Sequence, residues 1–137
     1  MKVVIDTNVL VSAIIAPTST PANILQAWRQ GRYELLTCAE QLDELRAATR
    51  YPKVRSRISP LVAGILINEI GKVANHIDRL PRVERSPDPR DNYLLALAEK
   101  GEANFLVSGD KADLLALGKH GGARIISVRE FATVLAL

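Results

Sequence analysis

Short apolar runs alternate with longer amphipathic segments along this chain. The apolar runs predict buried strands at 3–5, 33–37, 76–80, 104–107 and 124–126. Apolar residues at helical spacing predict the segments between and after them, at 9–15, 20–30, 42–48, 61–74, 90–100 and 112–117 and from 128 onward. Thr20-Pro21 and Ser59-Pro60 are typical helix starts, and the Ser127–Glu130 capping box opens the last helix. This alternation predicts an α/β fold whose five-stranded, mainly parallel sheet is covered on both faces.

Length and composition limit the classes of protein that the chain can be. Its 137 residues, 47% of them hydrophobic, suffice for a single domain over 1–137 with its own core. The lone Cys38 excludes a disulfide framework, and only two histidines argue against a histidine-built zinc site. No apolar run approaches the ~18–20 residues of a membrane span, and Asp6 falls where a signal peptide needs apolar residues. We therefore expect a cytoplasmic protein with no membrane partner.

Positive charge is concentrated in one segment. The formal net charge is only +3, but the segment 46–57 carries five cations and no acid: Arg46, Arg50, Lys53, Arg55 and Arg57. One interpretation is a solvated helix face. The other is a surface that follows the phosphates of a nucleic acid, with Arg50, Lys53 and Arg55 as the candidate RNA contacts. Aromatic residues make up 4% of the chain, so stacking platforms for bases are sparse.

Two aspartates follow predicted strands. Asp6 ends the first strand and lies between the apolar runs 3–5 and 9–11, where burial is expected to be deep. Asp110 comes just after the fourth strand. If these strands are neighbours, both carboxylates meet at the carboxyl edge of the sheet, where α/β folds bind ligands. Each is also open to a plainer interpretation as a helix cap.

Other acids are candidates for the same edge. Asp88 and Asp91 flank Pro89 at a helix start, which is typical both of capping and of acids that point toward the sheet edge. Glu44 belongs to a helix whose Leu42 and Leu45 face the sheet, and by itself it resembles a surface glutamate. A site built from these carboxylates contains only oxygen ligands, which suits Mg²⁺ or Mn²⁺. Such an ion favours phosphodiester hydrolysis.

The motifs together resemble the PIN domain, and most closely the VapC-like toxin ribonucleases of type II toxin–antitoxin systems. The resemblance rests on Val-Ile-Asp-Thr-Asn-Val-Leu at the start, the helical glutamate, Asp-Pro-Arg-Asp-Asn before an apolar helix, and Val-Ser-Gly-Asp-Lys after a strand. It covers nearly the whole chain, with the motifs in the family's order.

The resemblance implies a fold, an activity and a set of site residues. It implies a three-layer α/β/α sandwich, Mg²⁺- or Mn²⁺-dependent endonucleolytic cleavage of RNA, a homodimer, and inhibition by a cognate antitoxin protein. The implied catalytic and metal-binding acids are Asp6, Glu44, Asp91 and Asp110, with Asn8, Ser108 and Asp88 supporting them. The turn after the fourth strand departs from the family in two ways: Ser108 replaces a threonine, and Ala112 displaces the family's next acid to Asp113, which makes Asp113 a doubtful ligand. Glu40 is the alternative to Glu44, which is preferred because Leu42 and Leu45 match the family's apolar pattern around that acid.

Two other functions remain open at this point. The chain can be a PIN-like module that binds RNA or protein without cutting it; the presence of all four acids favours the enzyme. A phosphatase or receiver-like α/β domain is the third possibility. That class needs a second aspartate beside its nucleophile, and Asp6-Thr7-Asn8 lacks one.

Overall fold

A computed structural model describes all of residues 1–137. A six-stranded sheet in the order β3-β2-β1-β4-β6-β5 runs through its centre. The strands are β1 (Lys2–Ile5), β2 (Glu34–Thr37), β3 (Asn75–His76), β4 (Phe105–Val107), β5 (Lys119–His120) and β6 (Ala123–Ile126). All neighbouring pairs are parallel except β5 with β6. The predicted mainly parallel α/β sheet is therefore confirmed.

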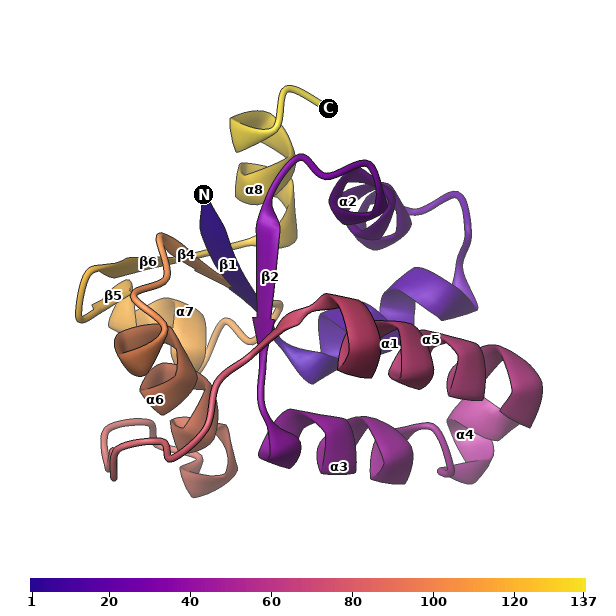
Figure 1. Cartoon of the computed structure of the whole chain (residues 1–137), viewed down its shortest axis with the longest axis horizontal. Coiled ribbons are helices and arrows are strands. Elements are labelled where there is room, and N and C mark those ends of the chain that lie inside the picture. The colour runs from indigo at the N-terminus through magenta and orange to yellow at the C-terminus, as the bar shows by residue number, and fades with distance from the viewer.

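Helices cover both faces of the sheet (Figure 1). One layer contains α6 (Asn92–Lys100) and α7 (Leu114–Leu117), and their leucines pack on Val4, Leu36 and Leu106. The other layer contains α1 (Thr7–Ile15), α2 (Thr20–Arg29), α3 (Ala39–Ala48), α4 (Pro52–Arg55), α5 (Pro60–Val73) and α8 (Val128–Val134). The alternation of side chains along β1 explains the division, because Val3 and Ile5 face one layer while Val4 faces the other. The result is a three-layer sandwich.

The structure corrects several predicted element boundaries. The third strand is Asn75–His76 rather than 76–80; the chain leaves the sheet after Ile77, and Arg79 adopts a left-handed φ of 55°. The sixth strand, β5, was not predicted because two residues carry no periodicity. It forms a hairpin with β6, whose turn contains Gly121 at φ 57°. The short helix α4 was also missed.

The helix before β5 is shorter than expected. It was predicted from residue 112, whereas α7 begins at Leu114, so Asp110 and Asp113 both lie in the loop that follows β4. A three-residue 3₁₀ helix, Pro89–Asp91, precedes α6. These two loops meet the carboxyl ends of β1 and β4, which are adjacent strands.

No single helix is long and apolar enough to cross a membrane; by length and composition, only α1 and α2 taken together, bent by 100°, reach that threshold.

Candidate active site

Asp6 stands at the carboxyl end of β1 and is 6% exposed. It caps α1: one carboxylate oxygen accepts a hydrogen bond from the backbone N–H of Asn8 (3.4 Å), and the other accepts one from Ser108 Oγ (2.9 Å). Burial raises the pKa of Asp6 most, and the charges of Glu44 and Asp110 raise it further, against the lowering effect of the two hydrogen bonds. The capping interpretation and the active-site interpretation therefore both apply to this residue.

Ser108 links the first two acids. Its hydroxyl donates to Asp6 and accepts from the backbone N–H of Asp110 at 3.0 Å. This connection exists because β1 and β4 are hydrogen-bonded neighbours, so that residues 102 positions apart meet at their carboxyl ends. Ser108 is fully buried, which holds this geometry rigidly.

Glu44 reaches the site from α3. Its Oε1 accepts a hydrogen bond from the phenol of Tyr93 (2.9 Å), and Thr7 Oγ1 lies 3.1 Å from the same phenol oxygen. The charge of Glu44 raises the pKa of both Asp6 and Asp91, whereas Glu40 is exposed on the first turn of α3 and contributes to neither shift. Of the two competing glutamates, Glu44 is the one near the other acids.

A buried glutamine fixes α3 beside the sheet edge. Gln41 lies one turn before Glu44 and donates from Nε2 to the carbonyl oxygen of Ile5 (2.6 Å) while accepting from the Thr37 hydroxyl (2.8 Å). Both side chains are fully buried. Since unpaired buried amides are costly, this network sets the position of the helix that carries Glu44.

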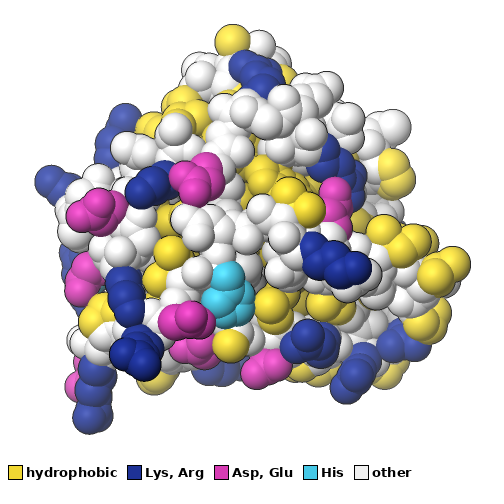
Figure 2. Space-filling view, in the orientation of Figure 1, with side chains coloured by type: hydrophobic (Ala, Val, Ile, Leu, Met, Phe, Trp, Pro, Cys, Tyr) yellow, Lys and Arg dark blue, Asp and Glu magenta, His cyan; other side chains and the backbone are white.

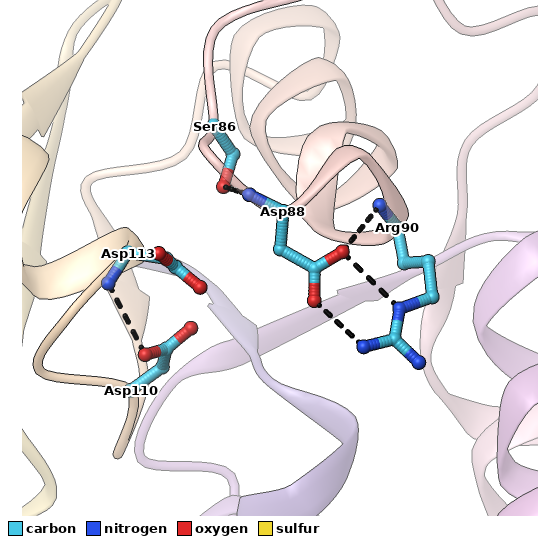
Figure 3. A network of polar contacts seen from close by, with 5 residues as sticks. All are labelled: Ser86, Asp88, Arg90, Asp110 and Asp113. Carbon is cyan, nitrogen blue, oxygen red and sulfur yellow. Dashed lines mark hydrogen bonds and ion pairs between the residues drawn. The ribbon is translucent and has the colours of Figure 1, made fainter.

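Asp88 and Asp91 come from the loop before α6. Asp88 caps the 3₁₀ helix and forms a two-pronged ion pair with Arg90, in which Nε and one terminal nitrogen donate at 3.1 and 3.0 Å (Figure 3). The pair with Arg90 lowers the pKa of Asp88. Asp91 forms no such pair: burial, followed by the charges of Asp6, Asp88, Asp110 and Glu44, raises its pKa to about 7.

Asp113 belongs to the cluster, contrary to the doubt raised by the sequence. Its backbone N–H donates to Asp110 Oδ1 at 3.2 Å, and the two side chains lie together opposite Asp88 in Figure 3. Single carboxylate oxygens of Asp88, Asp91 and Asp113 lie within 4.8 Å of one another. Burial and the charges of Asp110 and Asp88 raise the pKa of Asp113. This oxygen triad contains one of the four acids expected to bind metal, Asp91.

Asn8 bonds to Asp6 through its backbone only. Its N–H donates to the Asp6 carboxylate, while its exposed side chain lines, with Asp6 and Asp110, a hollow of about 440 Å³. The basic candidates lie elsewhere: Arg50 and Arg55 line a groove between α3, α4 and α5, and Lys53 does not.

Sequence reasoning did not identify Tyr93, Thr7 or Gln41 as parts of the site. Tyr93 is two residues beyond Asp91 and was counted with an apolar helix; a tyrosine at a helix start beside an acid is the available signal. Thr7 stands in the Asp-Thr-Asn motif, but its partner Tyr93 lies 86 positions away, and Gln41 bonds Ile5 across 36 positions, so the sequence shows neither contact.

The donor set fits a hard divalent cation. All candidate ligands are carboxylate oxygens, with no histidine or thiol among them, which matches the preference of Mg²⁺ and Mn²⁺. Burial raises the pKa values of Asp6 and Asp91 most, and the negative charges of neighbouring acids raise them further, so like charges lie close together at this edge. A bound cation would relieve that repulsion.

Comparison with known proteins identifies a family and a structural neighbour of this chain. A family model described as PIN domain matches residues 2–112. Among solved structures, a chain in the crystal structure of VapBC2 from Rickettsia felis bound to a DNA fragment from its promoter is similar in fold. The TM-score is 0.61 at 13% identity, and the match covers 93% of this chain and 98% of that one. No curated protein sequence matches.

Proposed function

Because the chain belongs to the PIN domain family, we propose that it is a metal-dependent endoribonuclease that hydrolyses RNA phosphodiester bonds. The observation that carries this proposal is the convergence of acids from four separate segments on Asp91, whose pKa their charges raise together with burial. Such crowding costs stability in a structural site, and it provides a binding site for a cation. The nuclease activity of the family gives the cation a reaction to assist.

The ion that the site accommodates is Mg²⁺ or Mn²⁺. Asp6, Glu44, Asp91 and Asp110 are the proposed catalytic and metal-binding residues. Carboxylate oxygens of Asp88 and Asp113 lie close to one of Asp91, so we add these two acids as further candidate ligands. When bound, the cation supplies Lewis acidity to the phosphate and to a water molecule. Ser108 orients Asp6 and Asp110, and Tyr93 orients Glu44.

We also propose a biological role as the toxin of a toxin–antitoxin pair, which is supported by the fold shared with a chain of the VapBC2 complex. We propose a cognate antitoxin protein as partner, a homodimer as the assembly, and the cytoplasm as the location of the enzyme. Co-expression with the product of an adjacent small open reading frame tests the partner: a stable complex with reduced ribonuclease activity is the expected result.

Cleavage of a circular single-stranded RNA tests the activity. We expect the purified protein to linearise the circle with Mg²⁺ or Mn²⁺ and to leave it intact in EDTA, because only an endonuclease opens a molecule without ends. The Asp6→Asn variant, purified in parallel, excludes contaminating nucleases.

The alternative is a PIN-like module that binds without cutting. An intact circle at every metal concentration, with RNA retained by the protein, would establish that alternative.

A further inference from the structure

A hollow of about 620 Å³ lies between α3, α4 and α5; we call it the α3/α5 groove. Four cationic residues and no acid line it: Arg46, Arg50, Arg55 and Lys72. Figure 2 shows Lys and Arg side chains gathered over this part of the molecule, at its lower right. Lys72 is not part of the basic segment 46–57 and comes to the groove from the last turn of α5. Tertiary structure therefore selects a different set of cations from the one that the sequence presented.

Two of these cations are uncompensated. The side chains of Arg50 and Lys72 form no hydrogen bond or ion pair, whereas Arg46 pairs with Asp43 at 3.0 Å and Arg55 Nε donates to the carbonyl oxygen of Thr49. Free, exposed cations around a hollow attract a polyanion, since no neighbouring acid neutralises their charge.

Two of the α5 residues that line the groove are glycines, which have no side chain. Gly64 and Gly71 line it, two helical turns apart, although glycine destabilises a helix interior relative to alanine. Neither glycine has a positive φ, and nothing lies within 4 Å of a Cβ added to Gly64. The fold does not require glycine there, and the open face lets a ligand approach the helix backbone closely.

The groove opens on the far side of α3 from the acids. Arg46 follows Glu44 by two positions, which turns its side chain by roughly 200° around the helix. One exposed aromatic residue connects the two sides: Tyr51 follows Arg50, is 63% exposed, and lies close enough to Arg90 to interact with its charge. Arg90 adjoins Asp91 and Tyr51 adjoins Arg50, so this pair offers a cation and an aromatic ring between the acids and the groove.

We propose that the α3/α5 groove binds the sugar–phosphate backbone of single-stranded RNA at a distance from the acids, with Arg50 and Lys72 as phosphate contacts and Tyr51 as a stacking platform. Nothing aromatic lines the groove itself, so it contacts phosphates rather than bases. An acidic protein segment is the less favoured ligand. The hydrophobic lining of the groove is limited to Leu42, Ala63 and Ile67, and the exposed apolar residues of α5, Leu61, Ile65 and Val73, lie outside it, so the groove offers little of the apolar centre of a protein interface. That the bound RNA is the substrate for cleavage rests on the proposed function, whereas RNA binding by the groove does not depend on it.

Binding of a fluorescent, roughly 20-nucleotide RNA in EDTA, over a range of KCl concentrations, tests the groove without cleavage. The double variant Arg50→Ala/Lys72→Ala is expected to bind on the order of tenfold more weakly and to lower the slope of log K against log salt by about 1.4, because two phosphate contacts are lost. The control Arg57→Ala/Lys119→Ala removes one arginine and one lysine outside the groove and is expected to change affinity less than about threefold.

A second variant tests the groove by shape instead of charge. Gly64→Leu fills the hollow and replaces glycine with a better helix former, so we expect weaker RNA binding together with an unchanged or higher Tm. Tyr51→Leu is expected to lower affinity roughly fivefold by removing a stacked base.

The outcomes separate this inference from the nuclease proposal. If the double variant and Gly64→Leu both bind RNA with the affinity of the parent protein, the proposed RNA-binding role of the groove is wrong, even if the protein cleaves RNA. Groove-dependent binding by a protein that never cuts would support the groove and refute the enzyme. If poly-glutamate binds through Arg50 and Lys72 while RNA affinity does not depend on them, the ligand is an acidic protein segment and the inference is wrong.

Discussion

The acidic edge of the sheet and the α3/α5 groove hold charge in opposite ways. At the edge, neighbouring side chains hold two of the carboxylates: Ser108 donates a hydrogen bond to Asp6, and Tyr93 donates one to Glu44. In the groove, the side chains of Arg50 and Lys72 form no hydrogen bond or ion pair. Burial perturbs the acids, as the pKa of Asp91 at about 7 shows, while the groove cations remain exposed.

This difference suggests separate roles: the acidic edge holds the catalytic cation, and the groove attracts RNA. A catalytic cation needs ligands fixed to within fractions of an ångström, and the edge supplies the buried Asp6 and Ser108 together with half-buried acids. Phosphates along a flexible strand need only nearby positive charge, which mobile side chains supply. Substitutions at the edge are therefore expected to act strongly and non-additively, and those in the groove weakly, additively and in a salt-dependent manner.

The largest effect is expected from Asp6→Asn, which keeps the size of the side chain and removes one negative charge. Loss of charge stabilisation at the metal is expected to lower the cleavage rate on the order of 10³-fold or more. RNA affinity is expected to stay at the parental level or to rise, since a charge that repels phosphate is gone. Single-turnover cleavage and RNA-binding anisotropy measure the two quantities.

A matched control is Asp78→Asn, which alters a carboxylate that is 79% exposed and remote from the site. Equal cleavage by the Asp6→Asn and Asp78→Asn proteins would remove the distinction between the two regions.

Tyr93→Phe is expected to have the next largest effect. It deletes the hydroxyl that holds Glu44 and contacts Thr7, and leaves the ring in place. Loss of such an orienting hydrogen bond is expected to weaken Mn²⁺ affinity roughly 10–100-fold. Mn²⁺ titration by calorimetry or electron paramagnetic resonance measures this change.

Tyr51→Phe deletes a phenol that is exposed and serves as the control. If both tyrosine variants bind Mn²⁺ as the parent does, Glu44 does not depend on Tyr93 for its position.

The pH dependence of stability is expected to be smaller. The folded pKa of Asp91 is about 7, against 3.8 for the free side chain, so between these values the folded state holds a proton that the unfolded state releases. The free energy of unfolding of the metal-free protein is thus expected to fall as the pH rises from 4 to 7. Asp91 is only half-buried and solvent screens it, so the loss is about 1 kcal/mol, or about 4 °C in Tm.

Mn²⁺ binds the ionised carboxylate and competes with that proton. Its addition is therefore expected to raise Tm more at pH 8 than at pH 5.5, and thermal denaturation followed by circular dichroism measures both increments. Asp91→Asn is expected to flatten the pH dependence. Equal Mn²⁺ increments at the two pH values would argue against a cation at this edge.

The smallest expected effect is the difference in RNA affinity between variants of two lysines. Lys72 lines the groove and Lys53 does not, although Lys53 lies in the basic segment of the sequence. Lys72→Ala is expected to weaken RNA binding about threefold and to lower the salt slope by about 0.7, a larger change than Lys53→Ala produces. RNA titrations at several KCl concentrations compare them. If Lys53→Ala weakens RNA binding more than Lys72→Ala does, the RNA contacts lie in the basic segment 46–57, as the sequence alone predicts.

The sequence by itself determined the elements that depend on local pattern. The apolar run before Asp6 predicted β1 and the burial of the Asp6 carboxylate that follows this strand. Ser127 and Glu130 predicted the capping box that opens α8. Periodicity and capping act within about four residues, so a single sequence shows them. Two-residue strands such as β5 carry no such pattern, and hydrogen bonding to a neighbour creates them.

Tertiary structure decided which side chains meet. Tyr93 bonds Glu44 across 49 positions, and Asp113 joins Asp88 and Asp91 because two loops end at adjacent strands. Lys72 reaches the groove because α5 packs beside α3. Local pattern gives each helix its buried and exposed faces, but strand order and helix packing determine which faces come together, and those are properties of the whole fold.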